Sequence, residues 1–189
     1  MKKLILSTFV FAIAIVASTV DVSAQMMKDD NPTVGGAAMY KSKNIVENAV
    51  NSKDLTTLVA AVKAAGLVDT LASAGPFTVF APTNAAFEKL PAGTVETLVK
   101  PENKATLTKI LTYHVVAGNA DSKSIMKAIK AGGGKAEFKT VAGGTLTATM
   151  DGKNLVLTDE KGGRSVVTIA DVRQSNGVVH VVDTVVLPN

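Results

Sequence analysis

The stretch 75–87 (GPFTVFAPTNAAF) constrains the fold most, because it places a turn, a strand and a helix start next to one another. The leading Gly-Pro pair interrupts any preceding element, and the alternating residues after it predict a short strand. Pro82 ends that strand because proline has no N–H for the ladder. Thr83 or Asn84 is then placed to cap a helix with Phe87 as its first apolar anchor. The stretch offers no thiol, carboxylate pair or phosphate-binding loop, so it points to folding and away from catalysis.

The first 24 residues have the three regions of a signal peptide. Two lysines open them, residues 4–20 are almost continuously apolar, and small residues precede Gln25, which predicts cleavage after Ala24. An uncleaved membrane anchor is the alternative, but the apolar run is near the lower limit for a span. The mature protein is therefore expected to be secreted or periplasmic, with no membrane span.

Composition narrows the class of the mature protein. Removal of these 24 residues from the 189 leaves 165, which is enough for one domain with its own core. The leader takes two lysines and one aspartate with it, leaving 18 Lys and Arg against 15 Asp and Glu. That charge is too weak for a nucleic-acid-binding protein. The absence of cysteine excludes disulfides, a thiol nucleophile and a cysteine-linked lipid anchor.

The rest of the chain divides into a spacer, a helical part and a strand-rich part. Residues 25–41 are polar and turn-rich without a period, which predicts a flexible spacer. Four segments then place apolar residues on one helical face, and the second of them shows the i, i+3, i+4, i+7 spacing. They run from Ile45 to Val50, from a cap at Asp54 to a stop at Gly66, from Pro101 to His114 and from a cap at Ser122 to the glycine run 132–134.

The apolar period changes to two in the last third of the chain, which predicts strands. Two turn signals, Asp151-Gly152 and the glycine pair after Lys161, separate the first three of them. The expected strands are 145–150, 155–158, 166–169, 178–182 and 185–187. Helices followed by antiparallel strands indicate the α+β class.

Three motifs resemble those of the fasciclin (FAS1) domain family: the stretch 75–87, a Tyr-His segment at 111–116 (LTYHVV) and a closing motif at 175–188 (SNGVVHVVDTVVLP). They occur in the family's order and spacing, so the resemblance covers 42–189 and implies a single FAS1 domain there. It implies a wedge of two β-sheets flanked by helices, with the motif residues serving the fold. These residues are Phe80, Pro82, Thr83, Asn84, Phe87, Tyr113, His114, Asn176, Gly177, His180 and Asp183.

The two histidines are the main candidates for chemistry. His114 and the preceding Tyr113 end an apolar helical stripe, which favours a buried, hydrogen-bonded ring over a proton-transferring or ligand-binding imidazole. In animal relatives the Tyr-His segment is linked to integrin binding. His180 lies within a strand of valines. Two isolated histidines without further ligands at zinc spacing do not predict a metal site.

No catalytic or cofactor-binding residue is predicted. The chain has no Gly-x-Ser-x-Gly elbow, and its glycine run at 132–134 fails the phosphate-loop pattern at two required positions. Scattered carboxylates leave glycoside hydrolysis open, but no acidic cluster marks a site. The protein is therefore expected not to be an enzyme and to need no cofactor.

The resemblance implies an exported adhesion or interaction module that binds a protein or glycan of a cell surface or matrix. The alternative is a carrier of an apolar small molecule of lipid or carotenoid type, as some relatives are. Contact residues are expected outside the motifs, in polar turns. The candidates are Asp121, Arg164, Asp171 and Arg173, with Asp171 in an exposed loop. Replacing all four is expected to weaken binding and leave the melting curve intact. Only Asp171 and an aliphatic neighbour match the integrin-contact sequence of animal relatives.

Overall fold

The computed structural model describes residues 31–189, and the expected signal peptide with its cleavage site lies outside them. Helices dominate the first part and strands the last, which confirms the α+β class. The helices are α1 (Ile45–Ala49), α2 (Thr56–Ala65), α3 (Val68–Ala72), α4 (Asn84–Glu88), α5 (Thr94–Leu98), α6 (Lys104–Tyr113) and α7 (Ser122–Ala131), with 3₁₀ turns η1 (Lys53–Leu55) and η2 (Pro101–Asn103). The strands are β1 (Thr33–Val34), β2 (Ala37–Ala38), β3 (Phe77–Pro82), β4 (Val115–Ala117), β5 (Lys135–Lys139), β6 (Thr145–Asp151), β7 (Asn154–Thr158), β8 (Arg164–Gln174) and β9 (Gly177–Val182).

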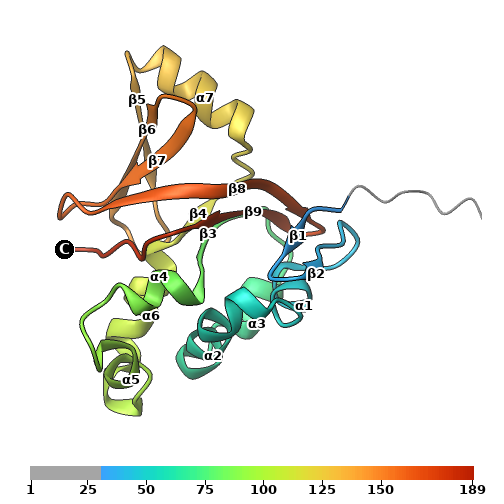
Figure 1. Ribbon diagram of the computed structural model, residues 1–189, viewed down its shortest axis with the longest axis vertical. Helices are drawn as coiled ribbons and strands as arrows, with labels where there is room; N and C mark the ends of the chain where they lie inside the picture. Colours follow the sequence, from blue (N-terminus) through green and yellow to red (C-terminus); the bar gives the residue numbers. More distant parts are fainter. Residues whose placement is uncertain (1–30) are drawn as a thin grey trace, which may run out of the picture. The chain divides into compact units, whose positions relative to one another are not determined.

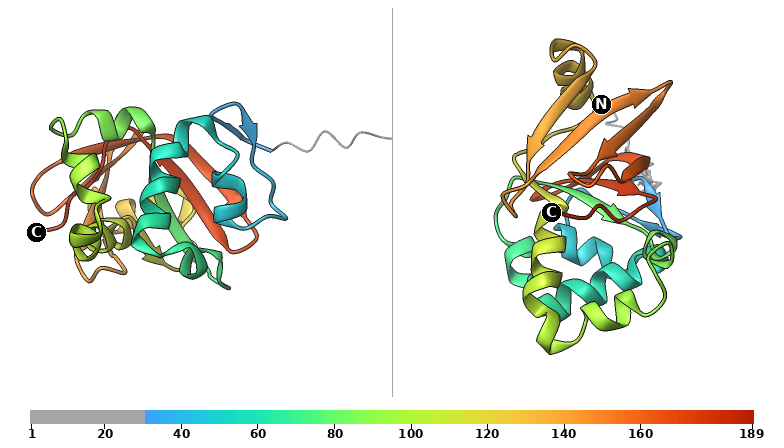
Figure 2. Two further views of the ribbon diagram at one scale, coloured as in Figure 1. Left: turned by 90° about the horizontal axis from the view of Figure 1, so that it is seen from below. Right: turned by 90° about the vertical axis from the view of Figure 1, so that its left-hand side faces the viewer.

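The strands form the expected wedge, and its two halves are joined in one hydrogen-bonded order of seven strands (Figure 1). Its order is β4-β3-β9-β8-β7-β6-β5, and only the β3–β9 pair is parallel. The long strand β8 joins the two halves, pairing through 164–166 with β7 and through 167–174 with β9. Register shifts on either side of Ile169 bend β8, as β-bulges do, and the halves diverge from it (Figure 2). A bridge between Val116 and Thr140 brings the outer edges together, so the sheet is nearly closed.

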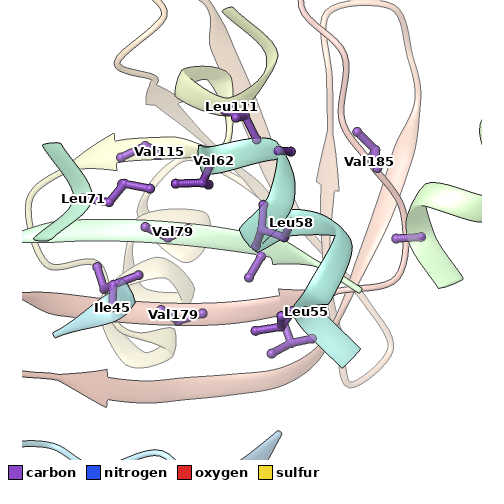
Figure 3. Close-up of a cluster of buried hydrophobic side chains, with 14 of the residues drawn as sticks. Ile45, Leu55, Leu58, Val62, Leu71, Val79, Leu111, Val115, Val179 and Val185 are labelled. Carbon is purple, nitrogen blue, oxygen red and sulfur yellow. The ribbon is translucent and has the colours of Figure 1, made fainter. Parts of the chain in front are cut away.

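Two hydrophobic cores lie on opposite faces of the two central strands, β3 and β9. Val79 and Ala81 of β3 point into the first core, under α1, α2, α3 and α6, whereas Phe80 between them points into the second. Figure 3 shows Leu58 and Val62 of α2 lying over the central strands in the first core. Because both faces are covered, β3 and β9 are buried almost throughout, as parallel neighbours usually are.

Several local signals predicted from the sequence are confirmed, and two of the expected helix caps are wrong. Gly66 ends α2 in the left-handed conformation (φ 72°), and Thr83 caps α4 by accepting a hydrogen bond from Ala86 N. Asp54 is not the cap of α2, because η1 occupies that position first. The cap of α7 is Asp121, one residue before the expected Ser122.

The expectation of a flexible spacer is wrong for residues 31–41. Strands β1 and β2 form a hairpin there, and Val34 and Met39 are each only 2% exposed in the first core. A Cβ on Gly35 would lie 2.4 Å from Asp54 N, so the hairpin packs directly against η1. Because each of these strands has only two residues, the sequence shows no apolar period that would predict them. The remaining spacer residues, 25–30, lie outside the described part.

The expected strand at 185–187 is also wrong, because side chains and not a neighbouring strand receive its N–H groups. Val186 N donates to His114 Nε2 at 3.2 Å, and Leu187 N donates to Asp159 Oδ2 at 2.9 Å. Residues 185–187 therefore belong to no helix or strand. Among the helices of residues 31–189, none has the length and apolar character needed to cross a membrane.

Candidate functional site

His114 is buried at the C-terminal end of α6, with 2% of its surface exposed. Its Nδ1 lies 2.8 Å from Ile110 O, and its Nε2 accepts the hydrogen bond from Val186 N. Because a backbone N–H only donates, the ring proton resides on Nδ1 and is donated to Ile110 O. Burial lowers the pKa of His114 to about 4. The ring is therefore neutral at pH 7, and both of its nitrogens are engaged inside the fold.

His180 is fully buried in β9 and has the opposite tautomer. Its Nδ1 accepts from Asp171 N at 3.3 Å, so Nε2 carries the proton and donates it to Ala120 O at 2.9 Å. The ring stacks on Phe80 with centroids 5.6 Å apart. Burial is the main cause that lowers the pKa of His180. Like His114, this imidazole is neutral and joins backbone segments that are distant in sequence.

Tyr113 and Asp159 bind the hairpins of the second half to the rest of the domain. The Tyr113 hydroxyl donates to Thr145 O at 2.7 Å and accepts from Glu160 N at 3.2 Å. Burial raises the pKa of Tyr113 to about 12. Asp159, which sequence reasoning missed, accepts from Gly163 N at 2.7 Å as well as from Leu187 N. The turn-forming residues after Asp159 were the only sequence signal for it.

Asn176 and Gly177 tie the β8–β9 turn to the helices. The Asn176 amide accepts from Ile45 N at 3.0 Å and donates to Leu71 O and Ser73 O at 2.8 and 2.9 Å. A Cβ on Gly177 would lie 2.0 Å from Phe77 O, so only glycine allows β9 to start this close to β3.

The remaining motif residues also contact neighbouring elements of the fold. Asn84 accepts from Thr57 N at 3.0 Å and donates to Lys53 O at 2.8 Å, joining α4 to the start of α2. Phe87 is buried in the first core, and Pro82 is the last residue of β3. Asp183 accepts from Val166 N at 2.8 Å. Partial burial acts to raise the pKa of Asp183, but hydrogen bonds from Val166 N, Lys89 and Thr184 lower it overall.

Three of the four candidate contact residues gather at the N-terminus of α7. Asp121 caps the helix through Ser124 N at 2.9 Å and pairs with Arg173 Nη2 at 3.0 Å. Hydrogen bonds from Ser124, helped by Arg173, lower the pKa of Asp121. The fourth residue, Arg164, lies at the opposite end of β8 and pairs with Asp151 at 2.9 Å.

The expectation that Asp171 lies in an exposed loop is wrong. Asp171 lies within β8 at the bulge, with a left-handed backbone (φ 59°) that few non-glycine residues adopt. Its carboxylate accepts hydrogen bonds from both Ser122 N, at 2.7 Å, and Ser122 Oγ. Asp171 therefore fastens the first residue of α7 to β8, a contact between residues 49 positions apart that no local pattern reveals.

We expect Asp171→Ala to lower the free energy of unfolding by about 1–3 kcal/mol, because it leaves the Ser122 donors without their acceptor. Asp171→Asn is the matched control, since asparagine tolerates the left-handed backbone and retains one oxygen acceptor. Urea unfolding of both variants measures the difference. Equal stability of the alanine variant and the unsubstituted protein would contradict this role. The same contacts imply that the fourfold replacement lowers the melting temperature, contrary to the sequence-based expectation.

A cavity of about 50 Å³ lies between the central strands and helices α1, α2 and α3. Its lining is almost entirely aliphatic and belongs to the first core shown in Figure 3. It includes Ile45, Leu58, Val62, Leu71, Val79 and Val179. Across residues 31–189 no group of three or more His, Asp or Glu side chains is placed to hold a metal ion. The described residues thus provide a small apolar cavity and polar side chains whose hydrogen bonds are directed into the fold.

Comparison with known proteins matches these features to one family. The family model described as "Fasciclin domain" matches residues 53–188. Protein sll1483 of Synechocystis sp. is 43% identical over 187 residues, which are 98% of this chain and 96% of the relative. The immunogenic protein MPB70 and the cell surface glycolipoprotein MPB83 of Mycobacterium bovis are 38% and 35% identical, each over 84% of this chain, covering 76% and 67% of the relatives.

The fold matches a solved structure as well. A FAS1 domain pair from the insect cell adhesion molecule fasciclin I superposes with a TM-score of 0.68 at 18% identity. The match covers 77% of this chain and 51% of that chain. The family model and the sequence relatives together establish that this protein belongs to the fasciclin domain family.

Proposed function

We propose that this protein is an exported, non-enzymatic interaction module that binds a protein or glycan at a cell surface or in the surrounding matrix. The observation that carries the proposal is the inward direction of the motif residues. His114, His180 and Asn176 are buried, and each forms a hydrogen bond with a backbone group that is distant in sequence. Side chains used in this way hold the fold together and leave recognition to exposed residues.

The relatives support the same proposal. One of them is named a cell surface glycolipoprotein, and the solved structure with this fold belongs to a cell adhesion molecule. The apolar leader with its predicted cleavage after Ala24 would deliver the chain to such a location. Fold likeness alone is weak support for a function, so the binding surface has to be tested directly.

The exposed arginines at the two ends of β8 are the best candidates for partner contact among the four residues predicted from sequence. The side chains of Arg164 and Arg173 are 60% and 50% exposed. Asp121 and Asp171 are engaged in holding α7, so their replacement would confuse loss of binding with loss of stability.

Binding of the purified protein to outer-surface extract of its native cell tests the proposal. We expect Arg164→Gln/Arg173→Gln to weaken binding roughly threefold to tenfold, as the loss of two exposed charge contacts would. Lys41→Gln/Lys100→Gln removes the same charge elsewhere and is expected to bind normally. Charges of this kind mainly steer association, so the loss should grow at low salt. No binding by the unsubstituted protein would contradict the proposed function, and normal binding by the arginine variant would place the surface elsewhere.

The aliphatic cavity favours a second candidate, a carrier of an apolar small molecule. Its volume of about 50 Å³ is well below the 300 Å³ or more typical of ligand pockets, so a lipid would require α1 and α2 to move outward. Organic extraction of protein purified from its native cell, followed by mass spectrometry, tests this. A stoichiometric apolar compound would support the carrier, and an extract without one would exclude it.

A further inference from the structure

Helix α7 presents a basic stripe to solvent, formed by Lys123, Lys127 and Lys130. The opposite face carries Ile125 and Ile129, which are buried in the second core. The lysines lie three and four positions apart and therefore share one side of the helix. In Figure 1, α7 lies beside strands β5 and β6, and the three lysines are exposed.

The positive charge of the domain is concentrated in this region. Residues 31–189 contain 17 Lys and Arg against 13 Asp and Glu. Residues 122–139, which comprise α7 and β5, contain five lysines against one glutamate. The rest of the described chain is therefore neutral, and the whole net charge of the domain comes from 18 residues.

The stripe is unfavourable for the isolated domain. Lys123 and Lys127 are an i, i+4 pair of like charge, and Lys127 and Lys130 are an i, i+3 pair, so each pair repels. Lys123 also lies in the first helical turn, where the helix dipole disfavours a cation. The four ion pairs within residues 31–189 involve other basic residues. An external anion would relieve this repulsion, since no acidic side chain of the described part does.

The stripe is also held rigidly. The α7 N-terminus is fixed by the Asp171 contacts to Ser122 and by the Asp121 cap, which itself pairs with Arg173. With a rise of about 1.5 Å per residue, the three lysines span about 10 Å along the helix axis. A fixed linear array of cations matches a polymer that repeats its anionic groups along its length.

We propose that α7 is a docking site for an acidic polysaccharide, whose carboxylate or sulfate groups pair with Lys123, Lys127 and Lys130. This names a partner class for the interaction module and rests on that proposed function. A bilayer fits less well, because Met126 is the one large apolar side chain of α7 that is exposed, at 36%, whereas membrane-bound helices insert an apolar face. A nucleic acid fits less well because α7 has no aromatic side chain for base stacking.

Affinity for defined polymers tests the inference. The probes are polygalacturonate and dextran sulfate, with neutral dextran and vesicles of anionic phospholipid as comparisons. The test variant is Lys123→Gln/Lys127→Gln/Lys130→Gln. The matched control, Lys41→Gln/Lys100→Gln/Lys104→Gln, removes the same charge from exposed lysines outside α7. We expect the α7 variant to lose on the order of tenfold in affinity for an acidic polymer and the control less than about twofold. Added salt should weaken binding of the unsubstituted protein.

Several results would overturn the inference. Equal losses in the two variants would mean that net charge alone attracts the polymer. Stronger binding to vesicles than to either acidic polymer would favour a membrane partner. Binding to native surface extract without binding to acidic polymers would refute the polysaccharide site and leave the interaction module standing, whereas absence of both would refute the two together. A melting temperature of the α7 variant at or above that of the unsubstituted protein would show that folding is not the cause of any loss.

Discussion

Replacing Phe80 with alanine is expected to lower the free energy of unfolding by about 3–5 kcal/mol. Phe80 of β3 is 1% exposed and lies in the second core with Ile125, Leu146 and Leu157. Its removal would leave a cavity beneath α7 and take away the ring that stacks on His180. Since domains of this size have about 5–15 kcal/mol of total stability, the variant should be close to unfolding at 37 °C.

Phe80→Leu is the matched control for this prediction. Leucine fills much of the same volume without the aromatic stacking, so the expected loss is below about 2 kcal/mol. Denaturant unfolding should show a lower midpoint with an unchanged slope in both variants. A loss below about 1 kcal/mol for the alanine variant would mean that the second core does not depend on this ring.

Acidification from pH 7 to pH 4 is expected to lower the stability of the domain by about 3 kcal/mol through His114. Its pKa is lowered from 6.5 to about 4 in the folded state, chiefly by burial. The unfolded chain therefore takes up a proton as the pH falls below about 6.5, while the folded protein resists protonation until about pH 4. Each unit of difference corresponds to about 1.4 kcal/mol, and the stabilisation is present at neutral pH and lost over this interval.

His114→Gln isolates this contribution. The variant should be less stable at pH 7 by on the order of 1–3 kcal/mol, because the donors and acceptors around the ring lose their partners. It should also lose less stability between pH 7 and pH 4 than the unsubstituted protein. His180→Gln is the control, since it retains His114 and its acid sensitivity. Identical pH dependence in the His114 variant and the unsubstituted protein would contradict a buried, neutral His114.

The elements that the sequence predicts well are those with local signals. The stretch 75–87 encodes β3, its end at Pro82 and the Thr83 cap of α4 within thirteen consecutive residues. The alternation in β6 and the apolar spacing in α7 likewise depend on near neighbours. Three such motifs in order were sufficient to recognise the family and the α+β wedge.

The parts that were missed depend on contacts between distant residues. Nothing near Val186 indicates that its N–H will bind His114, which lies 72 positions earlier, so the segment read as a strand. Asp171 was expected in a loop because its partner Ser122 lies in another element and leaves no local signal in the sequence. The two-residue strands β1 and β2 are stabilised by packing against η1 and the first core, which short-range periodicity does not report.

The candidate site was predictable in part for the same reason. The burial expected for His114 follows from the apolar residues of its helix, but the partners of the ring nitrogens of both histidines required the fold. The basic stripe of α7 can be read from the helical period of its lysines. It is inconspicuous in the composition because the rest of the described chain is neutral.

The central claim is that the motif residues serve the fold and that recognition lies on exposed surfaces. Its most direct test measures both properties of His114→Gln at pH 7: the unfolding midpoint and the affinity for native surface extract at a temperature where the variant remains folded. We predict a lower midpoint with binding equal to that of the unsubstituted protein. An unchanged midpoint together with lost binding would contradict the account and make His114 a recognition residue.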